Sequence, residues 1–374
     1  MKVWIALACV LGMLALFLVP AQAAENEEWQ AAVDAFDLDT LEDATPKDVL
    51  SIVEDLDLSP ESAEGADAFS LWDAVKARLT KAVADEMTPL KTLRLLIGLA
   101  AVAFFGRTLA VERGGWQERV TELLTLCACG VTLILPLGEL TEGIAEAVRA
   151  SVVYQRALIP VFAGLLTASG QASFSAFYAA FLLGYDQVVA TVSNQVLVPV
   201  CRMLLSLCVC LPLSSTSTFS LAGIRKGIVS VLAAINGIST ALLMAQSRIS
   251  ATVDRTAARA AKASLTALVP IVGTSLSESL SIILGSLDLV KTTVGVYSMI
   301  TVILLFLSPL VRILLWKLAL WGAGALFDAV GLQAEKKMLG SVSSLLTILM
   351  RVVLFCAVFL LVSTVIVMSA VSAI

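Results

Sequence analysis

Apolar and polar segments alternate along most of this chain, and the apolar segments are long. From Leu90 onward, runs such as residues 123–137 and 228–244 contain no charged side chain. A helix needs about 20 apolar residues to cross the hydrocarbon core of a bilayer. The pattern therefore predicts a membrane domain over residues 89–374, with about seven spans, give or take two, at that length per span.

The first 23 residues have the pattern of a secretory signal peptide. Lys2 precedes an apolar run over residues 3–19, and Ala21-Gln22-Ala23 gives a small-x-small cleavage site. The alternative is a first membrane helix that is retained. Cleavage would leave the mature N-terminus outside the cytoplasm.

Residues 24–88 predict a small helical region on the extracytoplasmic side. Thr45 and Pro46 have the residue types of a helix start. Further on, an apolar stripe at helical spacing is formed by Phe69, Trp72, Val75, Leu79 and Val83. About 60 residues is a marginal size for an independent core. We expect this region to pack against a partner or against the membrane domain.

Charge differs between the two parts of the chain. Residues 25–86 contain 18 acidic and 4 basic residues, whereas the membrane domain is mildly basic. Arginines at 107, 113 and 119 follow one apolar run, and glutamates at 139, 142 and 146 follow the next. Because cytoplasmic loops favour Lys and Arg, we expect the arginine loop inside the cell and the glutamate loop outside.

Two apolar regions carry helix-interrupting residues. The first contains Pro160 and Gly170. The second follows a basic stretch and contains the residues Asp254, Arg259, Lys262, Pro270, Gly273 and Glu278. Proline and glycine leave backbone groups that need new partners, and at membrane depth only protein or a water-filled cavity supplies them. We therefore expect broken helices here, and Glu278 as a candidate polar-path residue.

The two interrupted regions resemble each other. Residues 147–205 align with 257–315 at a constant offset of 110, with 15 of 59 positions identical. Pro160 then matches Pro270, and Arg202 matches Arg312. The segments are a candidate internal repeat, which transporters often use to pair broken helices. The alternative is two unrelated apolar helices that share a proline.

The sequence offers no catalytic or metal-binding motif. It has no histidine and no phosphate-binding P-loop, and its cysteines outside the leader lie in apolar runs, as buried small side chains do. We expect no enzyme activity, cofactor, metal or nucleic-acid partner. Three charges, Asp186, Asp288 and Lys291, are interpreted as span ends at the headgroups; the alternative is that they line a polar path or pair inside a bundle. Arg202 and Arg312 could contact lipid headgroups, snorkel, or pair with carboxylates.

Several of these segments together resemble the stage III sporulation protein AE family. They are 158–161, 166–170, 197–199 and, most specifically, Asp254 to Glu278, and the order of the other segments fits over nearly the whole chain. Gln171 follows Gly170 where the resemblance implies a second glycine.

The resemblance implies an all-α polytopic membrane protein of the mother-cell membrane around the forespore. Family members are similar in working with other membrane proteins of the same operon, in a channel or secretion-like complex needed for forespore development. The resemblance supplies no catalytic residue. The alternative function is a stand-alone secondary transporter with a substrate site at the broken helices.

Overall fold

The computed structural model describes residues 38–55, 68–85, 88–111, 115–210, 221–268 and 273–371. Within these ranges every regular element is a helix, so the predicted all-α class is confirmed. In chain order the elements are α3 (Asp39–Asp43), α4 (Lys47–Asp55), α5 (Ala68–Asp85), α6 (Thr88–Val111), α7 (Gly115–Ala168), α8 (Ala172–Thr191), the π-helix η1 (Val192–Leu197), α9 (Val198–Cys210), α10 (Leu221–Leu268), α11 (Gly273–Ala329) and α12 (Gln333–Val371). The leader, residues 1–23, lies outside the described residues.

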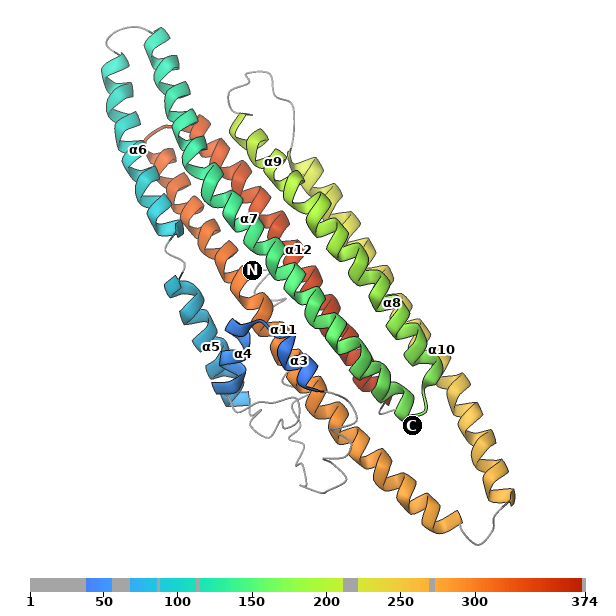
Figure 1. Cartoon of the computed structure of the whole chain (residues 1–374). Coiled ribbons are helices and arrows are strands. Elements are labelled where there is room, and N and C mark those ends of the chain that lie inside the picture. Colours follow the sequence, from blue (N-terminus) through green and yellow to red (C-terminus); the bar gives the residue numbers. More distant parts are fainter. Residues whose placement is uncertain are drawn as a thin grey trace.

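Six long rods make up the membrane domain. They are α6, α7, the continuous rod of α8, η1 and α9, and then α10, α11 and α12, and they run alternately up and down (Figure 1). Helix α7 has 54 residues and α11 has 57. At about 1.5 Å per residue α7 is about 80 Å long, whereas the hydrocarbon core of a bilayer is about 30 Å thick. The bundle therefore reaches well beyond one hydrocarbon core.

Helix α7 differs from the prediction in two respects. It continues through Pro160, so the predicted interruption there is wrong. A single proline removes one hydrogen bond, and the turns on both sides hold the rest of the helix. The glutamates at 139, 142 and 146 were expected in an external loop, but they lie in the middle of α7. Glu and Ala dominate that stretch, and both are strong helix formers.

Glycines end two of the helices. Gly170 has a φ of 81° and Gly331 a φ of 80°. After α7, the amide of Gln171 donates to the Leu166 carbonyl at 2.8 Å and that of Gly170 to the Thr167 carbonyl at 2.9 Å. This is the Schellman arrangement, which satisfies the last carbonyls of a helix and favours glycine at the left-handed position. Each turn reverses the chain into the next rod.

Gln171, the residue where the family resemblance implies a glycine, has a structural role. Its side chain is 1% exposed, and its amide nitrogen donates to the backbone carbonyl of Ala370 near the end of α12. The last carbonyls of a helix have no partner within the helix. The glutamine thus joins the α7–α8 turn to the far end of the chain.

The core is concentrated along α11 and α12. Its largest fully buried side chains include Trp316, Tyr297, Phe306 and Phe359. Gly295 of α11 faces Met368 of α12 so closely that an added Cβ would lie 2.5 Å from the Met368 sulfur. In contrast, α10 exposes a row of large apolar side chains: Val231, Ile235, Ile238, Leu242 and Ile249. Apolar side chains on an outer helix are typical of a lipid-facing surface.

Five helical segments among the described residues are long and apolar enough to cross a membrane, which lies within the range expected from the sequence. They are Thr88–Phe105, Val120–Ala168, Lys226–Ser250, Thr293–Ala329 and Gln333–Ala370. A shorter apolar segment, Val198–Cys208, lies in α9. These segments and the all-helical bundle support a multi-pass membrane protein.

The N-terminal helices pack against the side of the bundle. Helix α5 contacts α11, α4 contacts α11 and α5, and α3 contacts α7. Val75 and Ala82 of α5 pack on Leu307 and Val311. However, Leu79 and Val83 of the predicted apolar stripe are each 42% exposed. The face of α5 that packs against the bundle contains Arg78 in place of these two apolar residues, because Arg78 pairs with Asp48 of α4.

The candidate repeat does not give two equivalent hairpins. At an offset of 110, Gly170 aligns with Leu280, which lies inside α11. The first hairpin turns between α7 and α8 at Gly170, whereas α10 ends at Leu268 and α11 begins at Gly273. The ends of the paired helices are therefore about ten residues out of step with the alignment.

Replacing Gly170 with alanine should destabilise the protein. A residue with a Cβ pays roughly 1–2 kcal/mol in the left-handed region, so the free energy of unfolding should fall by about that amount. Gly98→Ala is the matched control, because Gly98 lies inside α6 with open space around it and alanine is the better helix former. Thermal unfolding of the full chain in detergent micelles measures both. Equal effects of the two changes would contradict the turn geometry.

Candidate functional site

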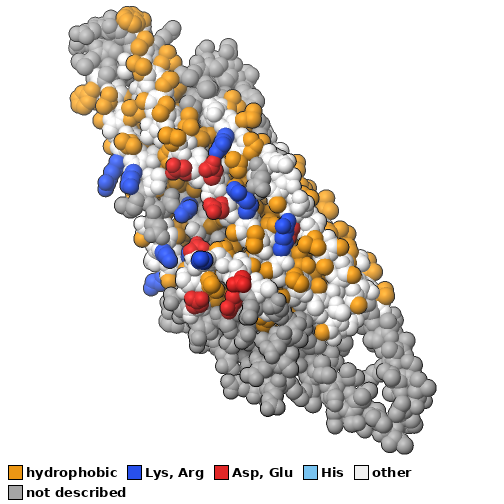
Figure 2. Space-filling model, in the orientation of Figure 1, with side chains coloured by type: hydrophobic (Ala, Val, Ile, Leu, Met, Phe, Trp, Pro, Cys, Tyr) orange, Lys and Arg blue, Asp and Glu red, His pale blue; other side chains and the backbone are white. Residues whose placement is uncertain are grey.

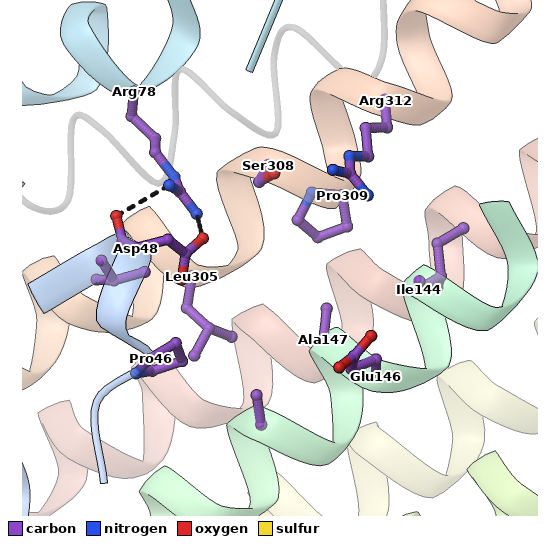
Figure 3. A pocket seen from close by; sticks show the side chains of 13 residues that line it. Pro46, Asp48, Arg78, Ile144, Glu146, Ala147, Leu305, Ser308, Pro309 and Arg312 are labelled. Carbon is purple, nitrogen blue, oxygen red and sulfur yellow. Dashed lines mark hydrogen bonds and ion pairs between the residues drawn. The ribbon is translucent and has the colours of Figure 1, made fainter. Parts of the chain in front are cut away.

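A cavity of about 290 Å³ opens where the N-terminal helices meet α7 and α11 (Figure 3). Small residues of α7, Gly143, Ala147 and Ala150, form one wall. They are spaced by four and three residues, so they share one face of the helix. Leu305, Ser308, Pro309 and Arg312 of α11 form the opposite wall. The small side chains of α7 leave the room that the cavity occupies.

Asp48 and Arg78 close the cavity on the N-terminal side. Arg78 of α5 donates from Nη1 to the Asp48 backbone carbonyl at 3.0 Å, and its Nη2 pairs with the Asp48 carboxylate (Figure 3). The Arg78 side chain is 6% exposed, whereas that of Asp48 is 57% exposed. This pairing explains why α5 turns Arg78 inward, because a buried guanidinium needs a charged or carbonyl partner.

Arg202 and Arg312, the two arginines matched in the candidate repeat, approach the same turn of α7. Arg202 of α9 forms an ion pair with Glu142. Arg312 of α11 lies over Gly143, where an added Cβ would be 3.5 Å from its Nη1. Of the alternatives open for Arg202, the structure selects pairing with a carboxylate.

Charged side chains gather at the middle of one face of the bundle, and we call this group the charged belt. The charged belt consists of Asp48, Arg78, Glu139, Glu142, Glu146, Arg149, Arg202 and Arg312. Figure 2 shows acidic and basic side chains gathered in the middle of one face, with hydrophobic side chains toward both ends. The Glu142–Arg202 pair is about half exposed, with 55% and 58% of the two side chains accessible.

Between the cavity and the α7–α8 turn, buried polar residues from several helices lie at the same height along the bundle axis. This polar layer consists of Tyr154 and Gln155 of α7, Asp186 of α8, and Ser298 and Thr301 of α11, all at most 3% exposed. The Tyr154 hydroxyl lies beside Ser298 and Thr301. Arg156, next to Gln155 in α7, contacts Gln187 of α8 at 3.5 Å. Asp186, which precedes Gln187, therefore lies at the same height along the bundle axis as Gln155.

The polar layer has few hydrogen bonds of its own. Among the described residues, no partner of good geometry reaches the hydroxyls of Tyr154, Ser298 and Thr301, the Gln155 amide nitrogen, or either Asp186 oxygen. Buried polar groups normally have partners. Exceptions of this kind are candidates for function. Asp186 is 0% exposed, so it lies inside the bundle and not on its outer surface.

The other predicted site residues lie away from this centre. Pro160 is 18 residues after Glu142 in α7, which is about 27 Å along the helix axis, and Gly170 is farther still. Asp254, Arg259 and Lys262 lie in the last part of α10, and Gly273 and Glu278 in the first part of α11. Both helices continue past the α7–α8 turn in Figure 1. Pro270 and the side chains over 254–289 lie outside the described residues.

Some of the site could be read from the sequence and some could not. Arg202 and Arg312 were singled out by their matched positions. Asp186 carried a signal, a lone carboxylate in an apolar region, but its depth depends on packing. Asp48 and Arg78 lie 30 residues apart in the acidic region, where charged residues are common, so no local pattern marks them as a pair.

Truncating the two partners of the Asp48–Arg78 pair should have unequal effects. Asp48→Ala leaves a buried guanidinium without its carboxylate, a loss of about 1–3 kcal/mol or more for a charged group. Arg78→Met leaves an exposed carboxylate that water solvates, so the loss should be smaller. Unfolding of the purified chain measures both, with Asp43→Ala as the control. A larger loss in Arg78→Met would contradict this arrangement.

Cysteines placed at 142 and 202 should be joined by a short thiol-reactive cross-linker. The two native side chains meet at their tips, so a bifunctional reagent about as long as the two side chains should cross-link α7 to α9 in the variant Glu142→Cys/Arg202→Cys, in a background without native cysteines. The matched control is Leu135→Cys/Arg202→Cys, because Leu135 lies two turns away on the same face of α7. Efficient cross-linking of the control, or none at 142, would disprove this register. Limited proteolysis followed by electrophoresis reads the result.

The comparisons with known proteins give one match. No curated protein and no solved structure matches the chain. A family described as stage III sporulation protein AE matches residues 57–371. This range includes α5 to α12 and the whole polar layer. It also includes the cavity and the charged belt, apart from their residues before position 57. The chain therefore belongs to the stage III sporulation protein AE family.

Proposed function

We propose that this chain is a non-enzymatic membrane component of a channel or secretion-like complex between the mother cell and the forespore. Family membership supports a role in sporulation, and the apolar helices support a multi-pass membrane protein. In the proposal the chain lies in the mother-cell membrane around the forespore and is needed for forespore development. Its N-terminal region faces the space between the two membranes.

The half-exposed charged belt is the observation that favours a subunit of a complex. Glu142 and Arg202 lie at the outer surface of the bundle, between apolar parts of the same helices. The proposal places the belt at membrane depth, where charged side chains in contact with lipid tails cost about 2.5–3.5 kcal/mol each or more. A neighbouring membrane protein would cover the belt. A complete stand-alone transporter would keep such charges inside.

The partners in this proposal are the other membrane proteins of the same sporulation operon, together with membrane lipid. The exposed apolar row of α10 suits lipid or the apolar helix of a partner. The proposal includes no nucleic acid, metal or cofactor. No residue of the charged belt or the polar layer is given a catalytic role, because neither contains a nucleophile with a neighbouring general base.

Purification of the tagged full-length chain from sporulating cells should bring down other membrane proteins of the operon in fixed proportion. Reversing one charge, Glu142→Arg, should reduce their recovery at least tenfold, because it breaks the pair and changes the covered surface. The charge-swapped variant Glu142→Arg/Arg202→Glu keeps the intramolecular pair. It should also lose the partners, because the polarity of the surface is reversed.

Full recovery of the partner proteins by the swapped variant would mean that the Glu142–Arg202 pair only joins α7 to α9. The charged belt would then no longer support a subunit of a complex. A chain that purifies alone, as a monomer or homo-oligomer, would favour the secondary transporter. Spore yield of the same strains gives an independent readout. The control is Ala180→Leu, an exposed position of α8 outside the belt.

A further inference from the structure

Asp186 is a carboxyl group that the packing of α8 buries completely. Its side chain is 0% exposed, and among the described residues neither carboxylate oxygen has a hydrogen-bond partner. An ionised carboxylate moved from water to an apolar site without a partner costs many kcal/mol, whereas a neutral carboxylic acid costs far less. The packing around Asp186 therefore suits the neutral acid.

The groups around Asp186 are engaged elsewhere. On its own helix, Tyr185 donates its hydroxyl to Asn236 of α10 at 3.2 Å and stacks on Phe359 of α12, with ring centroids 3.7 Å apart. Tyr178, also on α8, lies beside Ser363 of α12. Cys356 of α12 faces Tyr185. None of these groups supplies a positive charge.

Arg156 of α7 is the cation whose field reaches Asp186. It lies at the surface of the α7–α8 hairpin, where its Nη2 donates to the Gln187 side chain at 3.5 Å. The guanidinium and the carboxylate thus lie on the same hairpin, but the structure joins the guanidinium to the neighbouring glutamine. An ionised Asp186 would have a partner within reach if α8 turned toward the surface.

The chain has a place where α8 can turn. The π-helix η1 begins six residues after Asp186 and ends just before Pro199. Proline lacks the N–H that an α-helix would use, and π turns inside α-helices are frequent at functional sites. A change between π and α geometry moves the register by one residue, which turns α8 by about 100° relative to α9. Such a turn is large enough to carry a side chain from inside to outside.

A proton fits this site better than a metal ion. Among the described residues, no group of three or more His, Cys, Asp or Glu side chains comes together. Calcium and magnesium take six or more oxygen ligands, usually with several carboxylates. A proton needs one carboxylate.

We propose that Asp186 is a proton-binding site of the bundle. The carboxyl group carries a proton in the packing described here. When the proton leaves to water, the carboxylate moves toward Arg156 through a change of helix register at η1. The two arrangements make a bistable element of the kind that couples a local charge to a helix movement. This inference does not depend on the chain acting in a channel.

Infrared spectroscopy of the full-length chain in lipid nanodiscs tests the proton directly. At neutral pH the wild type should show the carbonyl stretch of a protonated carboxylic acid. Glu335 is also a fully buried carboxyl group, so the difference spectrum between the wild type and Asp186→Asn, nearly the same size, carries the test and should show the loss of one protonated carboxyl band. The matched control Asp328→Asn should give no such difference, because Asp328 is exposed and paired with Lys336. Absence of the band in the wild type, or identical spectra of the wild type and Asp186→Asn, would overturn the proposal.

A second variant tests the role of Arg156. Without the guanidinium the ionised form has no partner, so in Arg156→Gln the band should persist to higher pH, by about one unit, a tenfold change in proton affinity. Arg149→Gln, two turns away on α7, should leave the pH of band loss unchanged. The same shift in both variants, or in neither, would overturn the movement toward Arg156. The measurement of the band in the wild type does not depend on whether a variant folds.

Discussion

Antiparallel packing of α11 against α7 and α12 sets the positions of the other rods along the bundle axis. Helix α11 contacts α4, α5, α6, α7 and α12, so a slip of α11 along its axis would displace most of the bundle. Two contacts mark its register. Arg312 lies over Gly143 of α7, and Gly295 meets Met368 of α12. The second contact depends on glycine, because an added Cβ at Gly295 would lie 2.5 Å from the Met368 sulfur.

That register brings polar groups from separate helices to one depth. Tyr154, Asp186 and Thr301 come from three rods. Their burial in the interior of an apolar bundle costs stability unless hydrogen bonds or protonation offset it. The charged belt lies next to this polar layer along the rods.

Hydrophobic patterning predicted the class of the fold, the membrane domain and the approximate number of spans, because these depend on local composition. It failed where contacts between residues far apart in the sequence determine the local structure. Pro160 was predicted to interrupt the chain, yet the 54-residue helix α7 contains both Pro136 and Pro160 and continues through them. The glutamates after residue 138 were predicted to form a loop from their charge, and the Arg202 partner of Glu142, 60 residues away, left no local signal of a helix. The face of α5 that packs depends on Asp48, which its own apolar stripe cannot indicate.

The contact between Gln171 and Ala370 has a consequence for the order of assembly. The two residues are 199 positions apart, so a ribosome that makes about 5–20 residues per second needs at least about ten seconds to pass from one to the other. During that interval the glutamine amide has no final partner, although the α7–α8 hairpin is already made. The hairpin must wait in a provisional arrangement, open to lipid, to the insertion machinery or to another subunit. Completion of the bundle is thus timed by synthesis of its last helix.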